Sequence, residues 1–257
     1  MRVLLAWMIT LPALAQQVNF VACPVVRDTK TVPCFLAEYQ GETYFLGVQQ
    51  DITADFYPPQ LLHQALVEGI VAPGPRVCGG IPLKPVHVSV LAEVNRACNA
   101  ILPAEPEIDA PPSKRPAGPS TRQAPVSTAA VPPKKPEPPF TEHEFVIQYD
   151  FDSDFLFARN TRQLTDIAEY ARVSEAQKVE VTGYRGSTLL SNGNVLTEKS
   201  DVARLRAERV AEVLKGLGTP ASEVRWISEP ATANGATDYE SRRVAVRIVP
   251  VSKEKLP

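Results

Sequence analysis

A proline-rich stretch divides this chain and limits what it can fold into. Residues 103–140 hold 12 of the 25 prolines, mixed with Ala, Ser, Lys and Glu, and they show no hydrophobic period. Such a segment favours extended polyproline II at roughly 3.1 Å per residue, so it could hold its flanks up to about 100 Å apart. The sequence therefore predicts a linker between two folded units. The alternative is a proline-rich ligand for a groove-binding domain.

The charge balance of the chain argues against nucleic acid as a partner. The 257 residues carry 27 Lys and Arg against 29 Asp and Glu, a net charge of -2, and only 7% are aromatic. Duplex binders need clustered Lys and Arg to displace counterions from phosphates. We therefore expect no nucleic-acid partner.

The first residues have the pattern of a secretory signal. Arg2 supplies a positive charge, residues 3–14 are apolar with one Thr, and Ala13-Leu14-Ala15 ends the run in the A-x-A form that signal peptidases cut. An N-terminal membrane anchor is the alternative, but the run falls short of the roughly 20 residues that span a bilayer. We predict that residues 1–15 are removed and that the mature chain has no transmembrane segment.

All four cysteines, Cys23, Cys34, Cys78 and Cys98, fall in the first hundred residues. An exported chain meets an oxidising compartment, and the spacings match no zinc pattern, so we predict two disulfides and no metal site. Four cysteines allow three connectivities, and the sequence does not choose among them. Cys23 with Cys98 and Cys34 with Cys78 is slightly favoured, because the first pair would close the domain near its ends.

Residues 16–102 are predicted to form a small, mainly β domain, either a barrel or a sandwich. His87 is interpreted as a packed or rim histidine, and the hairpin aromatics are assigned to packing. The expected elements are strands at 35–39, 43–48, 65–71 and 86–91, with a short helix at 59–64.

Residues 141–250 have a different pattern, in which strands alternate with helices. The order β-α-β-α-β-β predicts a mixed sheet covered by helices, a two-layer α/β sandwich, so the whole chain is of the α+β class. Residues 251–257 are left as a C-terminal tail. The expected elements are strands at 145–149, 179–182, 223–227 and 243–248, a helix from Asn160 and a longer helix over 202–217.

Four short motifs give this second unit a family resemblance. They are Tyr149-Asp150-Phe151-Asp152-Ser153-Asp154, Gly183-Tyr184, Arg206-Ala207 followed by Val210 and Val213-Leu214, and Ser241-Arg242-Arg243-Val244. In this order and over about 110 residues, they resemble the OmpA-like domains, which include the peptidoglycan-associated lipoproteins. The first half of the chain is not covered by the resemblance.

The resemblance implies a non-catalytic module that grips the diaminopimelate of peptidoglycan stem peptides. In the family, an aspartate in the turn after the second strand binds the ammonium, and an arginine of the following helix binds the carboxylate. Arginine suits that task because its guanidinium can hold a carboxylate through two parallel hydrogen bonds. The residues that we expect at such a site are Arg206, Asp152, Tyr184, Gly186 and Phe151.

The sequence departs from the family at the turn, where Arg185-Gly186 stand in place of Thr-Asp. The stretch from Gly186 to Arg206 is also several residues longer than the usual loop. Either Glu198 or Asp201 replaces the missing aspartate, or the site has drifted to another ligand. Arg206 also has a structural interpretation, in which it covers the sheet edge and pairs with Asp152.

No motif of the chain indicates catalysis, since it has three His, no G-x-S-x-G, no H-E-x-x-H and no P-loop. We predict no enzyme activity and no cofactor. The leading hypothesis is a periplasmic protein of a Gram-negative envelope that docks on the cell wall, at or near the outer membrane, while residues 16–102 bind other envelope proteins. The alternatives are a scaffold or accessory subunit of an envelope or secretion complex, whose second domain binds protein rather than glycan, and a carbohydrate-active enzyme in residues 16–102.

Overall fold

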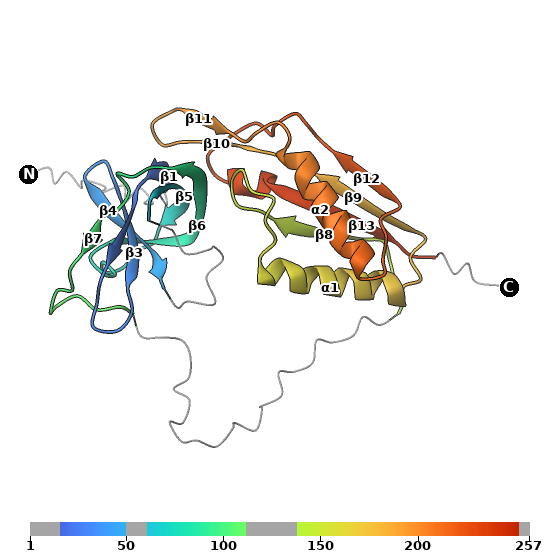
Figure 1. Cartoon of the computed structure of the whole chain (residues 1–257), viewed down its shortest axis with the longest axis horizontal. Helices are drawn as coiled ribbons and strands as arrows, with labels where there is room; N and C mark the ends of the chain where they lie inside the picture. The colour runs from blue at the N-terminus through green and yellow to red at the C-terminus, as the bar shows by residue number, and fades with distance from the viewer. Residues whose placement is uncertain (1–15, 50–60, 112–137, 252–257) are drawn as a thin grey trace, which may run out of the picture.

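A computed structural model describes residues 16–49, 61–111 and 138–251 of the chain (Figure 1). The predicted signal segment and the middle of the linker lie outside the described residues. Two domains stand beside each other, a β domain at the N-terminal side and an α/β domain at the C-terminal side. The fold class predicted from the sequence is confirmed.

The described residues of the N-terminal domain form a seven-stranded sheet in the order β1-β5-β6-β4-β3-β2-β7. The long strand β6 bends, so that its start pairs with β4 and its remainder with β5. This bend curves the sheet around one apolar core, in which Phe20, Leu46 and Val67 are buried. The strands are β1 (Gln17–Ala22), β2 (Pro24–Arg27), β3 (Cys34–Tyr39), β4 (Glu42–Val48), β5 (His63–Val71), β6 (Ile81–Val94) and β7 (Ile101–Leu102).

Two disulfides close this domain, Cys23–Cys98 and Cys34–Cys78, with Cα–Cα distances of 4.8 and 6.4 Å. The pairing that the sequence slightly favoured is therefore confirmed. Cross-links over 75 and 44 residues restrict the unfolded chain, and each contributes stability of about 3–5 kcal/mol in the chain-entropy account.

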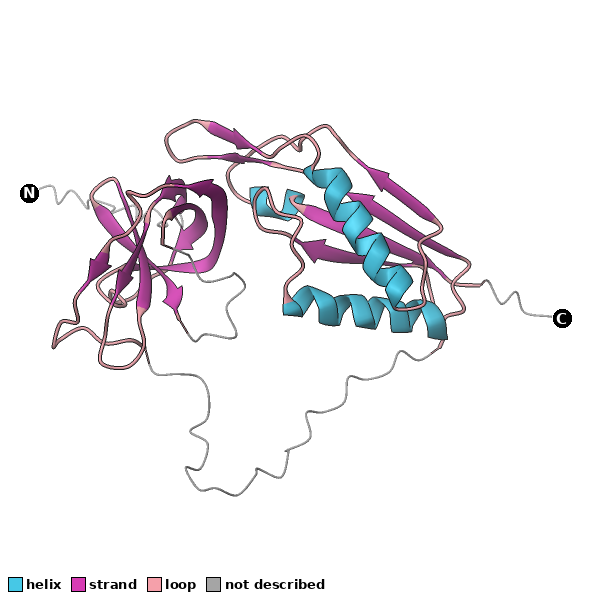
Figure 2. Ribbon diagram, viewed as in Figure 1, coloured by secondary structure: helices cyan, strands magenta, loops and turns pink. Residues whose placement is uncertain are grey.

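The C-terminal domain has two layers, with both helices packed on one face of a four-stranded sheet in the order β12-β9-β13-β8 (Figure 2). β8 and β13, and β9 and β13, pair antiparallel, whereas β12 and β9 pair parallel. The predicted order of elements is found here. The elements are β8 (His143–Gln148), α1 (Ala158–Val173), β9 (Lys178–Gly183), β10 (Ser187–Leu189), β11 (Val195–Thr197), α2 (Val202–Gly216), β12 (Glu223–Trp226), the 3-10 helix η1 (Asp238–Ser241) and β13 (Arg243–Val249).

The position of α2 depends on its apolar stripe and on one glycine of the sheet. Ala207, Val210 and Leu214 are buried on one side of the helix, against the sheet. At Gly183, a Cβ atom would lie 2.0 Å from the carbonyl oxygen of Ala203, so only glycine allows the helix to come this close. This close approach brings Arg206, one turn further along α2, over the ends of the strands.

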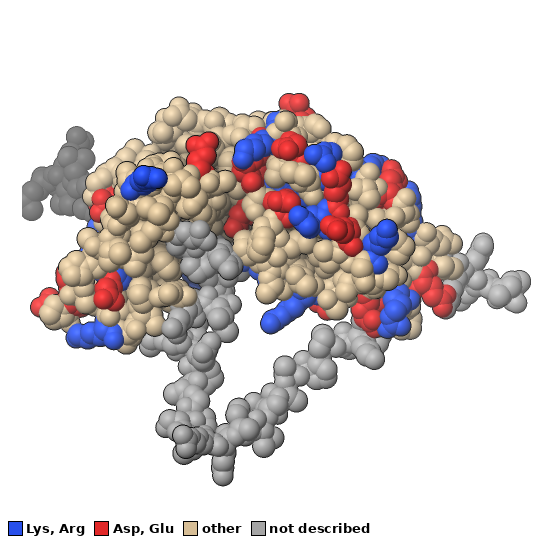
Figure 3. Space-filling view, in the orientation of Figure 1, with Lys and Arg blue, Asp and Glu red and all other residues tan. Residues whose placement is uncertain are grey.

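Charges of both signs cover the outside of the C-terminal domain. Acidic and basic side chains are mixed over its helical face, while the N-terminal domain shows few charged groups on the same side (Figure 3). On the opposite face of the sheet, Glu180 accepts ion pairs from Lys178 at 2.5 Å, Arg247 at 3.0 Å and Arg225 at 3.5 Å. No helix in the described part of the chain has the length and apolar character needed to cross a membrane.

Three sequence expectations about the backbone are corrected. The short helix at 59–64 is not found, because the described residues there, 61–64, form a turn and the start of β5. The stretch from Gly186 to Arg206, predicted only as a long loop, contains a hairpin, because β10 and β11 pair antiparallel within it. The linker does not hold the domains far apart, since they contact each other directly, and residues 105–110 at its start contact the N-terminal domain.

Candidate functional site

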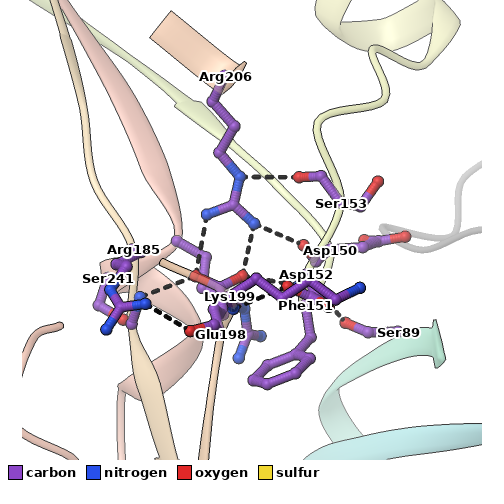
Figure 4. Close-up of polar contacts among 12 residues, drawn as sticks. Ser89, Asp150, Phe151, Asp152, Ser153, Arg185, Glu198, Lys199, Arg206 and Ser241 are labelled. Atoms are coloured by element: carbon purple, nitrogen blue, oxygen red, sulfur yellow. Dashed lines mark hydrogen bonds and ion pairs between the residues drawn. The ribbon is translucent and has the colours of Figure 1, made fainter. Parts of the chain in front are cut away.

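Arg206 of α2 is fully buried, and every hydrogen-bond donor of its guanidinium is taken by the chain itself (Figure 4). Nε donates to Ser153 O at 2.8 Å, Nη1 to Tyr184 O at 3.1 Å, and Nη2 to Asp150 O at 2.9 Å. The other two donors form a bidentate pair with the Glu198 carboxylate, at 3.0 and 2.5 Å. A guanidinium has five donors, so none is left for a ligand.

The Glu198 carboxylate is equally saturated. Besides the two bonds from Arg206, its oxygens accept the backbone N–H of Asp152 and that of Gly186, both at 2.8 Å. Four donors meet the roughly four lone-pair positions of a carboxylate. The side chain has no exposed surface, and it sits in a seat built by one cation and two amides. The seat therefore holds a carboxylate that comes from the chain.

Glu198 thus plays a different part from the one expected. The sequence suggested that Glu198 or Asp201 replaces the missing turn aspartate beside a ligand. Instead, Glu198 takes the position facing Arg206, where the resemblance places a ligand's carboxylate. Asp201 is exposed and precedes α2 as its N-cap residue.

Gly186, which stands where the family has its aspartate, has no room for a side chain. A Cβ atom there would lie 1.8 Å from Ser241 Oγ and 3.4 Å from Arg242 Cγ. Ser241 is itself held in place, since its hydroxyl donates to Asp238 O at 2.6 Å. The restoration of an aspartate at this position is therefore excluded by packing.

The other expected site residues gather around Arg206, but their polar groups bind within the chain. Asp152 has a φ of +55°, and its carboxylate accepts the Lys199 backbone N–H at 2.9 Å and pairs with Lys199 Nζ at 2.7 Å. It does not pair with Arg206. Phe151 is buried beneath the Arg242 guanidinium, and the Arg243 guanidinium carbon, Cζ, lies 4.6 Å from the centre of the Tyr184 ring. The ligand roles of these residues stay predictions.

A cavity of about 170 Å³ lies next to this seat, between the two domains. Its lining includes Asp150, Arg159 and Arg242 from the C-terminal domain and Ser89 from β6. Burial raises the pKa of Asp150 to about 6, although the nearby Arg159 and Arg242 oppose the shift. Burial also raises the pKa of the neighbouring Tyr149 hydroxyl. Above about pH 6 the Asp150 carboxyl is therefore ionised, and its buried charge destabilises the folded chain.

A second buried ion pair crosses the boundary between the domains. Arg242 binds Glu68 of β5 through both terminal nitrogens, and both residues are at most 3% exposed. Thr188 of β10 joins them, because its hydroxyl donates to Glu68 at 3.0 Å and lies 3.0 Å from Arg242 Nη1. Sequence reasoning assigned no role to Glu68. The available signal was a single carboxylate inside the otherwise apolar strand Ala65–Val71.

Three solved structures show what the C-terminal half of the chain is similar to. They are the OmpA-like domain of FopA1 from Francisella tularensis subsp. tularensis SCHU S4 (17% identity, 42% of this chain and 73% of that chain, TM-score 0.32), the peptidoglycan-associated lipoprotein from Burkholderia pseudomallei (19%, 40% and 87%, 0.31) and the periplasmic domain of Helicobacter pylori MotB (16%, 44% and 77%, 0.32). The first two carry in their names the groups that the motifs of this chain resemble. No family model and no curated protein matches the sequence.

Proposed function

We propose that this chain is a non-catalytic protein of the Gram-negative periplasm, and that it serves as a scaffold in the cell envelope. With the two domains in contact and Glu198 bound to Arg206, as described above, its C-terminal domain does not hold peptidoglycan. The N-terminal domain, residues 16–102, binds other envelope proteins. Of the functions predicted from the sequence, the scaffold role comes from the second hypothesis, whereas partner binding by residues 16–102 comes from the leading one.

One observation carries the proposal: the five donors of Arg206 are all bonded within the chain, two of them to Glu198. A stem-peptide carboxylate would have to displace the Glu198 carboxylate from four hydrogen bonds. Displacement would also require the backbone N–H groups of Asp152 and Gly186 to donate to the new carboxylate instead of to Glu198. The buried Arg206–Glu198 pair competes strongly with a ligand carboxylate. Its hydrogen bonds are bidentate and complete, and both of its charges are already desolvated.

Sedimentation with isolated sacculi tests the proposal. The mature chain from residue 16 is mixed with sacculi and centrifuged, with a peptidoglycan-associated lipoprotein as the positive control. We expect the lipoprotein in the pellet and the mature chain in the supernatant. Sedimentation of the unmodified mature chain with sacculi would reject the proposal.

A further inference from the structure

A row of three polar side chains crosses the face of the N-terminal sheet that meets the C-terminal domain. Asn19 of β1 is paired with Glu68 of β5, and Glu68 is paired with His87 of β6. Asn19 and Glu68 are only 2% and 3% exposed. Buried polar groups are costly unless they have partners, so this row needs something polar to cover it.

Each residue of the row finds its partner in the C-terminal domain. Asn19 exchanges hydrogen bonds with Ser191, since its backbone N–H donates to Ser191 Oγ at 2.9 Å and its carbonyl accepts the Ser191 N–H at 2.7 Å. Glu68 binds Arg242 and Thr188 as described above. The ring of His87 stacks on that of Tyr239 at 3.7 Å. The row is thus a specific docking surface.

The β10–β11 hairpin connects this docking surface with the Arg206 seat. On one side, the hairpin contacts the N-terminal domain through Thr188, Ser191 and the carbonyl of Leu189, which accepts Asn19 Nδ2 at 3.0 Å. At its base, the residues that flank its two strands are Gly186 and Glu198, which bond to each other. A two-stranded hairpin is marginally stable alone, so its contacts hold it in place.

We propose that docking of the N-terminal domain and closure of the Arg206 seat are one coupled switch, with the β10–β11 hairpin as the connecting element. When the row of Asn19, Glu68 and His87 leaves the C-terminal domain, the hairpin loses its contacts with the N-terminal domain and keeps only those within its own domain, such as Leu189 with Asp238. Glu198 then leaves the seat, and Arg206 becomes available to a carboxylate from outside. This inference rests on the proposed function, because it explains how the same seat would be regulated.

The test uses the mature chain with Glu68→Ala, which leaves Arg242 without its acid. A buried cation without a partner must regain water, so the domains should separate, and the radius of gyration from small-angle X-ray scattering should rise. The seat is read from hydrogen exchange at the amides of Asp152 and Gly186, which donate to Glu198. We expect exchange at both to become at least about tenfold faster.

Two further variants separate the switch from general damage to the fold. Glu38→Ala removes an exposed carboxylate of β3 in the same domain, and it should change neither the radius nor the exchange. Thr188→Val keeps the volume of the buried side chain but removes the hydroxyl that joins Glu68 and Arg242. It should speed exchange at Asp152 and Gly186 while leaving the fold of the N-terminal domain intact.

The results that would overturn the switch differ from those that would reject the proposed function. If Glu68→Ala separates the domains but the two amides keep their protection, the coupling is wrong. An unchanged radius with Glu68→Ala would show that the row does not control docking. Neither outcome depends on sacculi, whereas the scaffold proposal fails only if the unmodified mature chain binds them.

Discussion

Within the described residues, two arginines are buried, each against a glutamate, but the two pairs have different roles. Arg206 meets Glu198 from the same domain, eight residues earlier in the chain, whereas Arg242 meets Glu68 from the other domain. In the first pair, the surrounding polar groups belong to the backbone: three carbonyls bind the arginine and two amides bind the glutamate. In the second pair, the additional partner is the Thr188 side chain.

This difference indicates which pair can be replaced by apolar side chains. A pair enclosed by backbone groups cannot be exchanged for apolar side chains without leaving those groups unsatisfied. A pair between side chains can be exchanged more freely, because apolar residues of similar volume often stabilise as well as a buried ion pair. The Arg206 seat is therefore part of the fold of its domain, while the Arg242 pair acts as a contact between domains.

The largest effect is expected from Glu198→Ala. The variant leaves the Arg206 guanidinium buried with two empty donors, and it orphans the amides of Asp152 and Gly186. We expect a loss of about 3–5 kcal/mol in the free energy of unfolding, measured by urea denaturation. Glu208→Ala is the matched control, because its exposed pair with Arg204 on the same helix contributes at most about 1 kcal/mol. Equal effects of the two variants would contradict the enclosed seat.

Double replacements sharpen the comparison between the two pairs. Met at both Glu68 and Arg242 should come within about 1 kcal/mol of the natural chain, because the removal of both charges leaves only Thr188 to find another partner. Met at both Glu198 and Arg206 should still cost about 3 kcal/mol or more, since five backbone groups lose their partners. Urea denaturation of the two double variants decides the matter. A similar cost for both would show that the backbone groups do not distinguish the pairs.

A smaller effect, with the opposite sign, is expected at Asp150, whose carbonyl binds Arg206 while its side chain lines the cavity beside Arg242. Burial raises its pKa from 3.8 to about 6, so the folded chain holds this proton more tightly than the unfolded chain. Stability from this group is therefore lost as the pH rises from about 4 to 6.

Asp150→Asn removes this dependence on pH. Near pH 8 the free energy of unfolding of the variant should be about 2–3 kcal/mol higher than that of the natural chain. Near pH 3.5 the two values should be almost the same. Thermal or urea unfolding at the two pH values measures the difference. A uniform effect at both would show that the charge of Asp150 is not the cause.

The smallest effect is expected at Gly186, whose role depends on close packing against Ser241 and not on charge. Gly186→Ala should cost about 1–3 kcal/mol, because its Cβ would overlap Ser241 Oγ. Ser241→Gly in the same chain should restore most of the loss, with Ser241→Gly alone as the control. No recovery in the double variant would indicate that backbone conformation, and not this overlap, requires glycine at 186.

Much of the C-terminal fold could be read from local patterns. Residues 145–149 and 243–248 alternate as expected for strands, and the apolar spacing along 202–217 marks the buried side of α2. These signals depend on neighbours in the chain and on solvent, so they are visible without tertiary information. The hairpin within 187–197 was missed because its strands are only three residues long and half of their residues are polar. Its stability comes from contacts with distant residues such as Asn19 and Asp238.

The sequence predicted which residues lie at the candidate site, but not that their polar groups are already bonded to each other. The motif placed Arg206 correctly on a helix, and the extra length of the loop before that helix pointed to Glu198 as one of two carboxylates. The contact between the domains at Glu68 had only a weak signal in the sequence. One charged residue in an apolar strand does not show which part of the chain will cover it. Cross-strand neighbours that are 49 residues apart, such as Asn19 and Glu68, are not visible as a row in a linear chain.

By itself, the sequence determined the separation of the chain by prolines, the cysteine-bearing first domain and the alternating strands and helices of the second. Each of these follows from local chemistry: the missing donor of proline, the redox chemistry of thiols and the period of apolar residues. Only the tertiary structure decided that Arg206 faces its own glutamate and that the domains touch. Both depend on the packing of the whole chain, because a buried charge must find a partner wherever the fold brings one close, and leaving it unpaired is costly.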